Sequence, residues 1–148
     1  MRIPRKISCV GQVVTPNSVT NPFTGARAAA FAFLIRSPSG NVCTKVLGSD
    51  IVVHCPMGNI LVGLRNSHVR TMRATAEHPI PRPWQEPLAV EPGSSYRQTA
   101  IEHGARVLLA AHVRMVSRSR HTEVVYWWTT CPGFGDTKLT LLDPSVER

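Results

Sequence analysis

Alternating apolar and polar residues mark the first segment of the chain that can form regular structure. In residues 6–14 (KISCVGQVV), Ile7, Cys9 and Val13 fall on one side of an extended chain, and Gly11 interrupts the alternation. A period of two predicts a β-strand, and a glycine within it predicts a bulge. We therefore expect the chain to open with a bulged strand.

Residues 26–37 (ARAAAFAFLIRS) form the second predicted strand, after a long turn at 15–25. Their alanines would suit a helix, but Phe31, Phe33 and Ile35 alternate, and turn residues end the run. These three apolar side chains share one face of a strand, which is typical of a core position.

The later strands follow from the same pattern and from turn residues. Residues 42–54 are predicted to be a strand broken at 48–50. The turn 56–59 joins this strand to 60–64 as a hairpin, so we expect an antiparallel sheet. The remaining predicted strands are 105–117, for which we favour a strand over a helix, 123–130 and 138–142.

A proline-rich stretch separates the two groups of strands. Five prolines between residues 79 and 92 rule out a regular helix there and disfavour a central strand. We expect residues 65–99 to form one long loop or insertion. The length of 148 residues fits a single domain, 1–148. The predicted fold is mainly β, a small antiparallel OB-like barrel of five to six strands with this one long loop.

The composition also indicates where the protein is located and whether its cysteines are reduced. No stretch approaches the roughly 20 apolar residues that cross a bilayer, and the N-terminal segment does not read as an export signal. We expect a soluble cytoplasmic protein with no membrane span. The four cysteines form no CxxC pair, so we expect buried thiols rather than a zinc site or disulfides. They are Cys9, Cys43, Cys55 and Cys131.

Charge is the strongest compositional signal. The formal net charge is +8, and residues 1–76 hold nine Lys or Arg against a single acid, Asp50. Such an excess attracts nucleic acid and anionic membrane surfaces. Because 14 of the 17 basic residues are Arg, the base composition of the coding DNA can also explain it.

No catalytic, cofactor-binding or metal-binding motif occurs in the chain. The sequence has no GxSxG elbow, no phosphate-binding P-loop and no dinucleotide-binding glycine pattern. Its six histidines have no metal-ligand spacing. We therefore predict a protein that is not an enzyme and that uses no cofactor.

Tryptophans are the candidates for contact with a partner. Trp127 and Trp128 are consecutive in a predicted strand, so they point to opposite faces and one of them faces outward. Trp84 lies within the segment 80–87 (IPRPWQEP), whose prolines can hold an extended backbone. Each ring can instead pack within the fold, Trp84 over the barrel and the outward ring beneath the long loop or a partner subunit.

Several short motifs carry a family resemblance by their order. A Gly-x-Val step stands at 11–13, a turn similar to Ser-Pro-Leu-Ser-Gly at 21–25 (NPFTG), and a strand with aromatic residues at 28–35. Two apolar strands around the turn 56–59 follow, and no acid precedes that turn. After the insert, residues 99–113 are similar to a Glu-x-x-Leu-x-x-Gly-Asp entry into a strand.

In this order the motifs resemble the GIDE-type domain found in mitochondrial membrane ubiquitin ligases and in many bacterial proteins. The likeness covers nearly the whole chain, and residues 139–146 (LTLLDPSV) resemble the closing strand of that domain. The resemblance implies a β domain of this type. In the ligases, activity belongs to a separate zinc-bound RING, and flanking transmembrane helices anchor the protein. This sequence shows neither pattern, so ligase activity is not implied.

Two hypotheses from different classes follow. The first is a noncatalytic β-barrel interaction module that binds a protein partner, or another copy of itself, through Trp84, Trp127 and Trp128. The alternative is an OB-like protein that binds single-stranded nucleic acid through a basic groove and exposed aromatic residues. The basic residues predicted for that groove are Arg27, Arg36, Lys45, Arg65, Arg70, Arg73, Arg114, Arg118 and Arg120.

Overall fold

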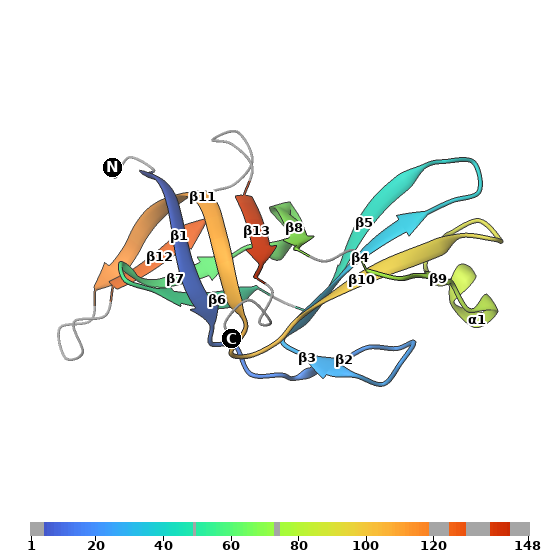
Figure 1. Ribbon diagram of the computed structural model, residues 1–148, viewed down its shortest axis with the longest axis horizontal. Helices are drawn as coiled ribbons and strands as arrows, with labels where there is room; N and C mark the ends of the chain where they lie inside the picture. The colour runs from blue at the N-terminus through green and yellow to red at the C-terminus, as the bar shows by residue number, and fades with distance from the viewer. Residues whose placement is uncertain (1–4, 49, 73–74, 119–124, 130–136, 143–148) are drawn as a thin grey trace.

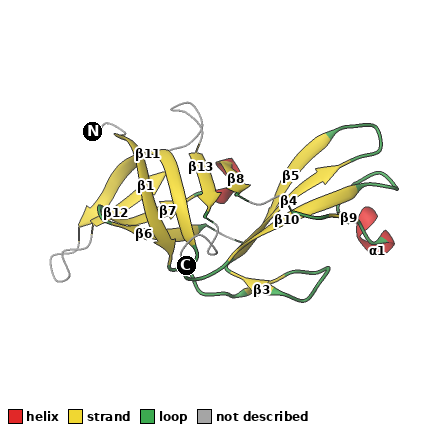
Figure 2. Ribbon diagram, viewed as in Figure 1, coloured by secondary structure: helices red, strands yellow, loops and turns green. Residues whose placement is uncertain are grey.

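The computed structural model describes residues 5–48, 50–72, 75–118, 125–129 and 137–142, and it confirms the mainly β class (Figures 1 and 2). The strands are β1 (Arg5–Val13), β2 (Val19–Thr20), β3 (Arg27–Ala28), β4 (Ala30–Arg36), β5 (Val42–Leu47), β6 (Ile51–Cys55), β7 (Gly58–Val62), β8 (Ser67–Thr71), β9 (Glu77–Pro79), β10 (Ser95–Ile101), β11 (Arg106–Arg118), β12 (Val125–Thr129) and β13 (Thr137–Leu141). Two short helical turns are present, η1 (Leu64–Asn66) and α1 (Arg82–Gln85). No helix in these ranges has the length and apolar character needed to cross a bilayer.

The larger sheet has seven strands in the order β1-β6-β7-β12-β11-β13-β8, and β1 also pairs with β11. The pairing of β1 with β11 runs from Arg5↔Val113 to Gln12↔Arg106. The pairing of β1 with β6 is limited to Gln12↔His54 and Val13↔Val53, at one end of β1. Strand β1 therefore has hydrogen-bonded neighbours on both edges.

The expectation of a purely antiparallel sheet is wrong. Strand β12 pairs with β7 in parallel, and β13 pairs with β8 in parallel. The predicted hairpin between β6 and β7 is antiparallel and is confirmed. A short turn forces antiparallel pairing, whereas β12 and β13 reach their partners after long connections, which leave either direction open.

A second, four-stranded sheet has the order β5-β4-β10-β9 and is antiparallel throughout. Figure 1 shows it projecting from the larger sheet, with α1 and β9 near its far end and the two-stranded β2–β3 ribbon beside its base. We call it the projecting sheet. Its edge strands are β5 and β9.

Two hydrophobic clusters hold the sheets together. The first fills the inside of the larger sheet, where Val107, Leu109 and Val113 of β11 are fully buried. The second lies on one face of the projecting sheet and includes Phe31 and Phe33, which are 1% and 7% exposed. Each such side chain contributes about 1.5–3 kcal/mol when it is fully buried. The core position predicted for the two phenylalanines is confirmed.

The two sheets meet at a waist of small residues, Ala28, Ala29, Ala30 and Gly48. The three alanines are at most 4% exposed. A Cβ atom added to Gly48 would lie 3.1 Å from the Ala30 Cβ and 3.2 Å from the Ala29 carbonyl oxygen. The φ angle of Gly48, +115°, also requires glycine. The alanines of this segment therefore reflect close packing rather than helix formation.

The stretch 65–99 is not one long loop, so the loop alternative of that expectation is wrong. It contains β8, β9, α1 and the start of β10. The prolines are compatible with this structure because of where they fall. Pro79 ends the edge strand β9, Pro81 is the N-cap of α1, and Pro83 lies in the first turn of that helix, where no backbone N–H is needed.

The bulge predicted at Gly11 is also absent, because the register of β1 with β11 continues through Gly11↔Val107. The glycine has a different role. A Cβ atom at Gly11 would lie 2.6 Å from Val53 Cγ1 and 2.7 Å from the His54 carbonyl oxygen. Glycine therefore allows β6 to approach β1 closely.

We expect Gly11→Ala to lower the free energy of unfolding by about 1–3 kcal/mol, because the new methyl group forces β6 away from β1. Urea unfolding followed by fluorescence measures the change. Gly63→Ala is the matched control, since its Cβ would meet the Thr129 hydroxyl at an ordinary 3.7 Å. Equal stability losses in the two variants would contradict the close approach of β1 and β6.

Candidate functional site

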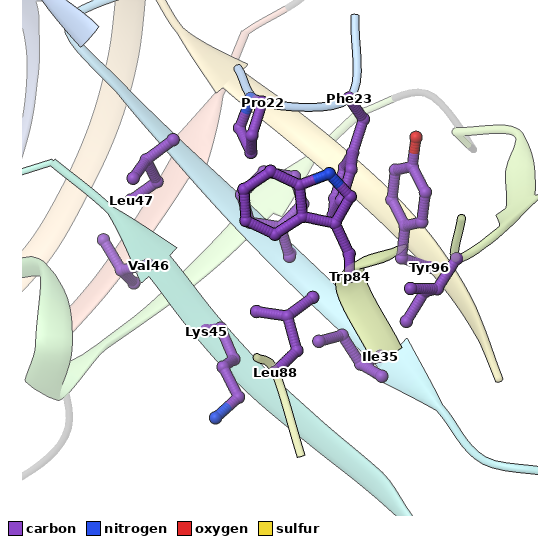
Figure 3. Close-up of a pocket in the computed structure, with 11 residues that line it drawn as sticks. Pro22, Phe23, Ile35, Lys45, Val46, Leu47, Trp84, Leu88 and Tyr96 are labelled. Atoms are coloured by element: carbon purple, nitrogen blue, oxygen red, sulfur yellow. The ribbon is translucent and has the colours of Figure 1, made fainter. Parts of the chain in front are cut away.

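An apolar pocket of about 190 Å³ lies on one face of the projecting sheet (Figure 3). Its floor is formed by Phe33 and Ile35 of β4, Lys45 and Leu47 of β5, and Tyr96 of β10. These side chains share one face because Phe33 is opposite Lys45, and Ile35 is opposite Tyr96, in antiparallel register. Alternation along three adjacent strands therefore builds the floor.

One wall of the pocket is the turn 21–25, which places Pro22 and Phe23 at its rim. The turn is fixed by Asn21, which is 1% exposed. The Asn21 side-chain oxygen accepts a hydrogen bond from the Phe23 N–H at 2.8 Å, and its amide nitrogen donates to Gln98 Oε1 at 2.5 Å. The second bond joins the turn to β10, so the position of Phe23 depends on Asn21.

Trp84 covers the pocket from the opposite side. Its backbone N–H donates to the Pro81 carbonyl at 2.9 Å, and its own carbonyl accepts from the Leu88 N–H at 3.1 Å. This turn of helix places both Trp84 and Leu88 against the sheet. Figure 3 shows the indole between Leu47 and Tyr96, with the Lys45 ammonium pointing away from the ring. Trp84 and Leu88 are half-buried, so the pocket is open to solvent beside them.

Aromatic rings hold these segments in place. Phe23 meets Trp84 edge to face at 5.7 Å between ring centroids, and it lies 4.8 Å from Tyr96 and 5.7 Å from Phe33. Such ring pairs contribute about 0.5–1.5 kcal/mol each beyond the area they bury. Phe23 is the centre of the group, since it contacts a ring from the cover and two from the floor.

The chemistry of the pocket is that of apolar binding. Among its lining residues only Lys45 and Tyr96 carry an ionisable side chain, and burial raises the pKa of the Tyr96 phenol. The other lining side chains are apolar. Its volume is below the roughly 300–1,000 Å³ of small-molecule sites. The pocket therefore suits one apolar side chain better than a cofactor.

A second hollow, also of about 190 Å³, lies further along the same edge of the sheet. Val42 and Cys43 of β5, Val90 and Ser94 line it, and it shares Ile35 with the first pocket. Both hollows therefore follow β5, whose residues Val42 to Lys45 are all exposed. Because β5 has a partner on one side only, its other backbone edge is open among the residues described.

The three tryptophans predicted to bind a partner lie in different environments. Trp84 lies at the pocket. Trp127 is half-buried against the first hydrophobic cluster, donates its indole N–H to the Met57 carbonyl at 3.0 Å, and has the Arg5 guanidinium 5.8 Å from its ring. Trp128 is opposite Arg114 in the register, but its side chain lies outside the described residues. Partner binding by these tryptophans stays a prediction.

The basic residues predicted for a nucleic-acid groove do not converge on one surface. Arg27 lies on β3, Arg36 and Lys45 on the projecting sheet, and Arg65 on η1. Arg70 of β8 and Arg114 of β11 lie on the larger sheet. The side chain of Arg118 and all of Arg73 and Arg120 lie outside the described residues.

The cysteines partly follow the expectation. Cys55 is buried and Cys9 is half-buried, but Cys43 is exposed because β5 is an edge strand, so the prediction is wrong for Cys43. Cys131 lies outside the described residues. Burial, with smaller contributions from the hydrogen bond and the charge of neighbouring Cys55, raises the pKa of the Cys9 thiol to about 12.

Of the residues around the pocket, Trp84 and Lys45 were predicted as binding residues, and Phe33 and Ile35 as core residues. Phe23 was placed in a turn, and Tyr96 and Leu88 carried no signal that linked them to it. In the described part of the chain, no group of three or more His, Cys, Asp or Glu residues could hold a metal ion.

Comparisons with known proteins identify no relative: no protein family, curated protein or solved structure matches the chain. The GIDE-type resemblance therefore stays a prediction.

We expect Asn21→Ala to lower the free energy of unfolding by about 1–3 kcal/mol, since it leaves the partly buried Phe23 N–H and Gln98 side chain without these hydrogen bonds. Loss of near-ultraviolet circular dichroism from the aromatic group should accompany the loss of stability. The control is Asn17→Ala, which removes a hydrogen bond to the exposed backbone N–H of His103. A change no larger than that of the control would contradict the role of Asn21.

We expect iodoacetamide at about pH 8 to alkylate Cys43 of the native protein well before Cys9 and Cys55, since thiolates are the reactive form and Cys9 remains protonated there. Peptide mapping by mass spectrometry measures each site in a Cys131→Ser background. All three thiols should react at similar rates in denaturant. Modification of Cys9 before Cys43 in the native state would contradict the burial and the raised pKa of Cys9.

Proposed function

We propose that the chain is a noncatalytic interaction module, with an OB-like arrangement of its larger sheet, that binds an extended segment of a protein partner on the projecting sheet. The observation that carries the proposal is the apolar pocket beside the open edge of β5. We propose a cytoplasmic location for this module, as expected from the sequence.

The geometry of the edge supports strand addition. An extended peptide that pairs with β5 would obtain main-chain hydrogen bonds from the open backbone edge. Its alternate side chains, about 7 Å apart, would project to the same face of the sheet. The two hollows lie in succession on that face, at Cys43 and at Lys45 to Leu47. A peptide with apolar residues at positions i and i+2 fits this spacing, and Lys45 favours an acidic residue nearby.

Pairing order supports the OB-like assignment. Hydrogen-bonded neighbours lead from β1 through β6, β7, β12 and β11 back to β1, with β12 parallel to β7. An OB fold is a five-stranded, partly open Greek-key barrel. The GIDE-type resemblance agrees with this arrangement, and its turn at 21–25 forms a wall of the pocket. Strands β8 and β13 and the projecting sheet are additions to such a barrel.

Selection from a phage-displayed library of random linear peptides tests the proposal. We expect enriched peptides to share an apolar residue in an extended sequence and to slow the alkylation of Cys43 when bound. Trp84→Ala and Leu88→Glu should each weaken binding of an enriched peptide by about 30-fold or more, as loss of a central anchor does. Fluorescence anisotropy of the labelled peptide measures the affinity.

The matched control is Leu34→Glu, which makes the same change on the opposite face of β4, where Leu34 is exposed. It should leave peptide affinity unchanged. Failure to enrich any peptide, or enriched peptides that bind all variants equally, would overturn the proposal. Sedimentation of the protein alone tests whether a second copy of the chain occupies the edge instead of a partner. Dimers of the unmodified protein that the Leu88→Glu variant does not form would indicate a second copy.

A further inference from the structure

A basic face covers the outside of the larger sheet and is separate from the pocket. It spans β1, β11, β13 and β8, which are neighbours in the sheet. On these strands the residues that alternate with buried core residues point outward. We call this surface the outer face.

Five basic residues occupy outward positions there, and all five are exposed. They are Lys6, Arg70, Arg106, Arg114 and Lys138. His68 and His112 lie on the same face. The four strands contain no Asp or Glu. Within these four strands the outer face therefore has one sign of charge, unlike the chain as a whole, which carries nine acids.

Register gives the layout of the outer face. Arg106 and Arg114 stand eight positions apart on β11, about 26 Å along the strand, and the four strands are about 14 Å across. Lys6 is opposite His112 on one edge of β11, and Lys138 is between Ala110 and His68 on the other. The basic residues thus surround a central area.

The central area is formed by small and apolar side chains. Val10 is opposite Leu108, and Ser8 is opposite Ala110. Val10 and Leu108 are 44% and 37% exposed. Their side chains are shorter than the Arg and Lys side chains around them.

We propose that the outer face binds single-stranded nucleic acid, with phosphates on the basic rim and bases over Val10 and Leu108. Phosphates match a face whose four strands hold several cations and no carboxylate. A membrane fits less well, because Val10 and Leu108 are each less than half exposed and offer little apolar area to insert among acyl chains. A duplex keeps its bases stacked inside and would leave the apolar centre uncovered.

This surface differs from the groove predicted from the sequence, which included Arg70 and Arg114 but not Lys6, Arg106 or Lys138. It also does not depend on the peptide site. If all five cations contact phosphates, the logarithm of the binding constant should fall with the logarithm of salt concentration with a slope of about −3.5, five times the value of about −0.7 per contact.

Anisotropy of a labelled oligothymidylate of roughly 16 nucleotides, titrated at several salt concentrations, tests the proposal. We expect binding at low salt with a slope between about −2 and −3.5. The variant R70E/K138E should bind at least about tenfold more weakly. R27E/R36E changes the net charge by the same amount on other sheets and should bind like the unmodified protein.

Four results would overturn the proposal: no binding at low salt, equal weakening in both double variants, a duplex bound as tightly as the single strand, or tighter binding to vesicles of anionic phospholipid. Leu88→Glu should leave oligonucleotide binding unchanged. That variant therefore distinguishes failure at the outer face from failure at the peptide site.

Discussion

The alignment of β11 with three neighbouring strands is the interaction on which the rest of the structure depends. This strand has 13 residues, where about five or six are usual. One edge pairs with β1, and the other pairs with β13 over Val107–Ala110 and then with β12 from Val113 onward. The inward residues of β11 supply the centre of the first hydrophobic cluster. Its outward residues include two of the five cations of the outer face, so one register determines both the core and the charged surface.

The projecting sheet depends on a different kind of contact. Its stability comes from aromatic rings contributed by segments far apart in the chain, and Phe23 links the turn, the strands and the cover. An arrangement of this kind leaves one sheet edge open, because the cover over the face ends beside β5. Stability and binding are therefore provided by the same residues, and loss of Phe23 or Trp84 would affect both.

Local patterns in the sequence predicted most strands, because alternation is a property of a few consecutive residues. The hairpin of β6 and β7 and the long strand β11 were found in this way. The parallel pairings of β12 and β13 could not be, since they join segments separated by tens of residues. The pocket was missed except for Trp84 and Lys45, because Phe23 and Tyr96 meet only through the turn bonded by Asn21. A usable signal did exist for the outer face: Lys6, Arg106 and Lys138 each alternate with apolar residues on a strand.

The waist of alanines and Gly48 has a consequence for how the protein can vary. Larger side chains there would push the two sheets apart, so the least distinctive stretch of the sequence should be among the least tolerant of substitution. The exposed strands on either side have no such restriction. Mutations could therefore accumulate on the peptide edge and on the outer face independently, while the short small-residue segment keeps both surfaces in a constant relative orientation.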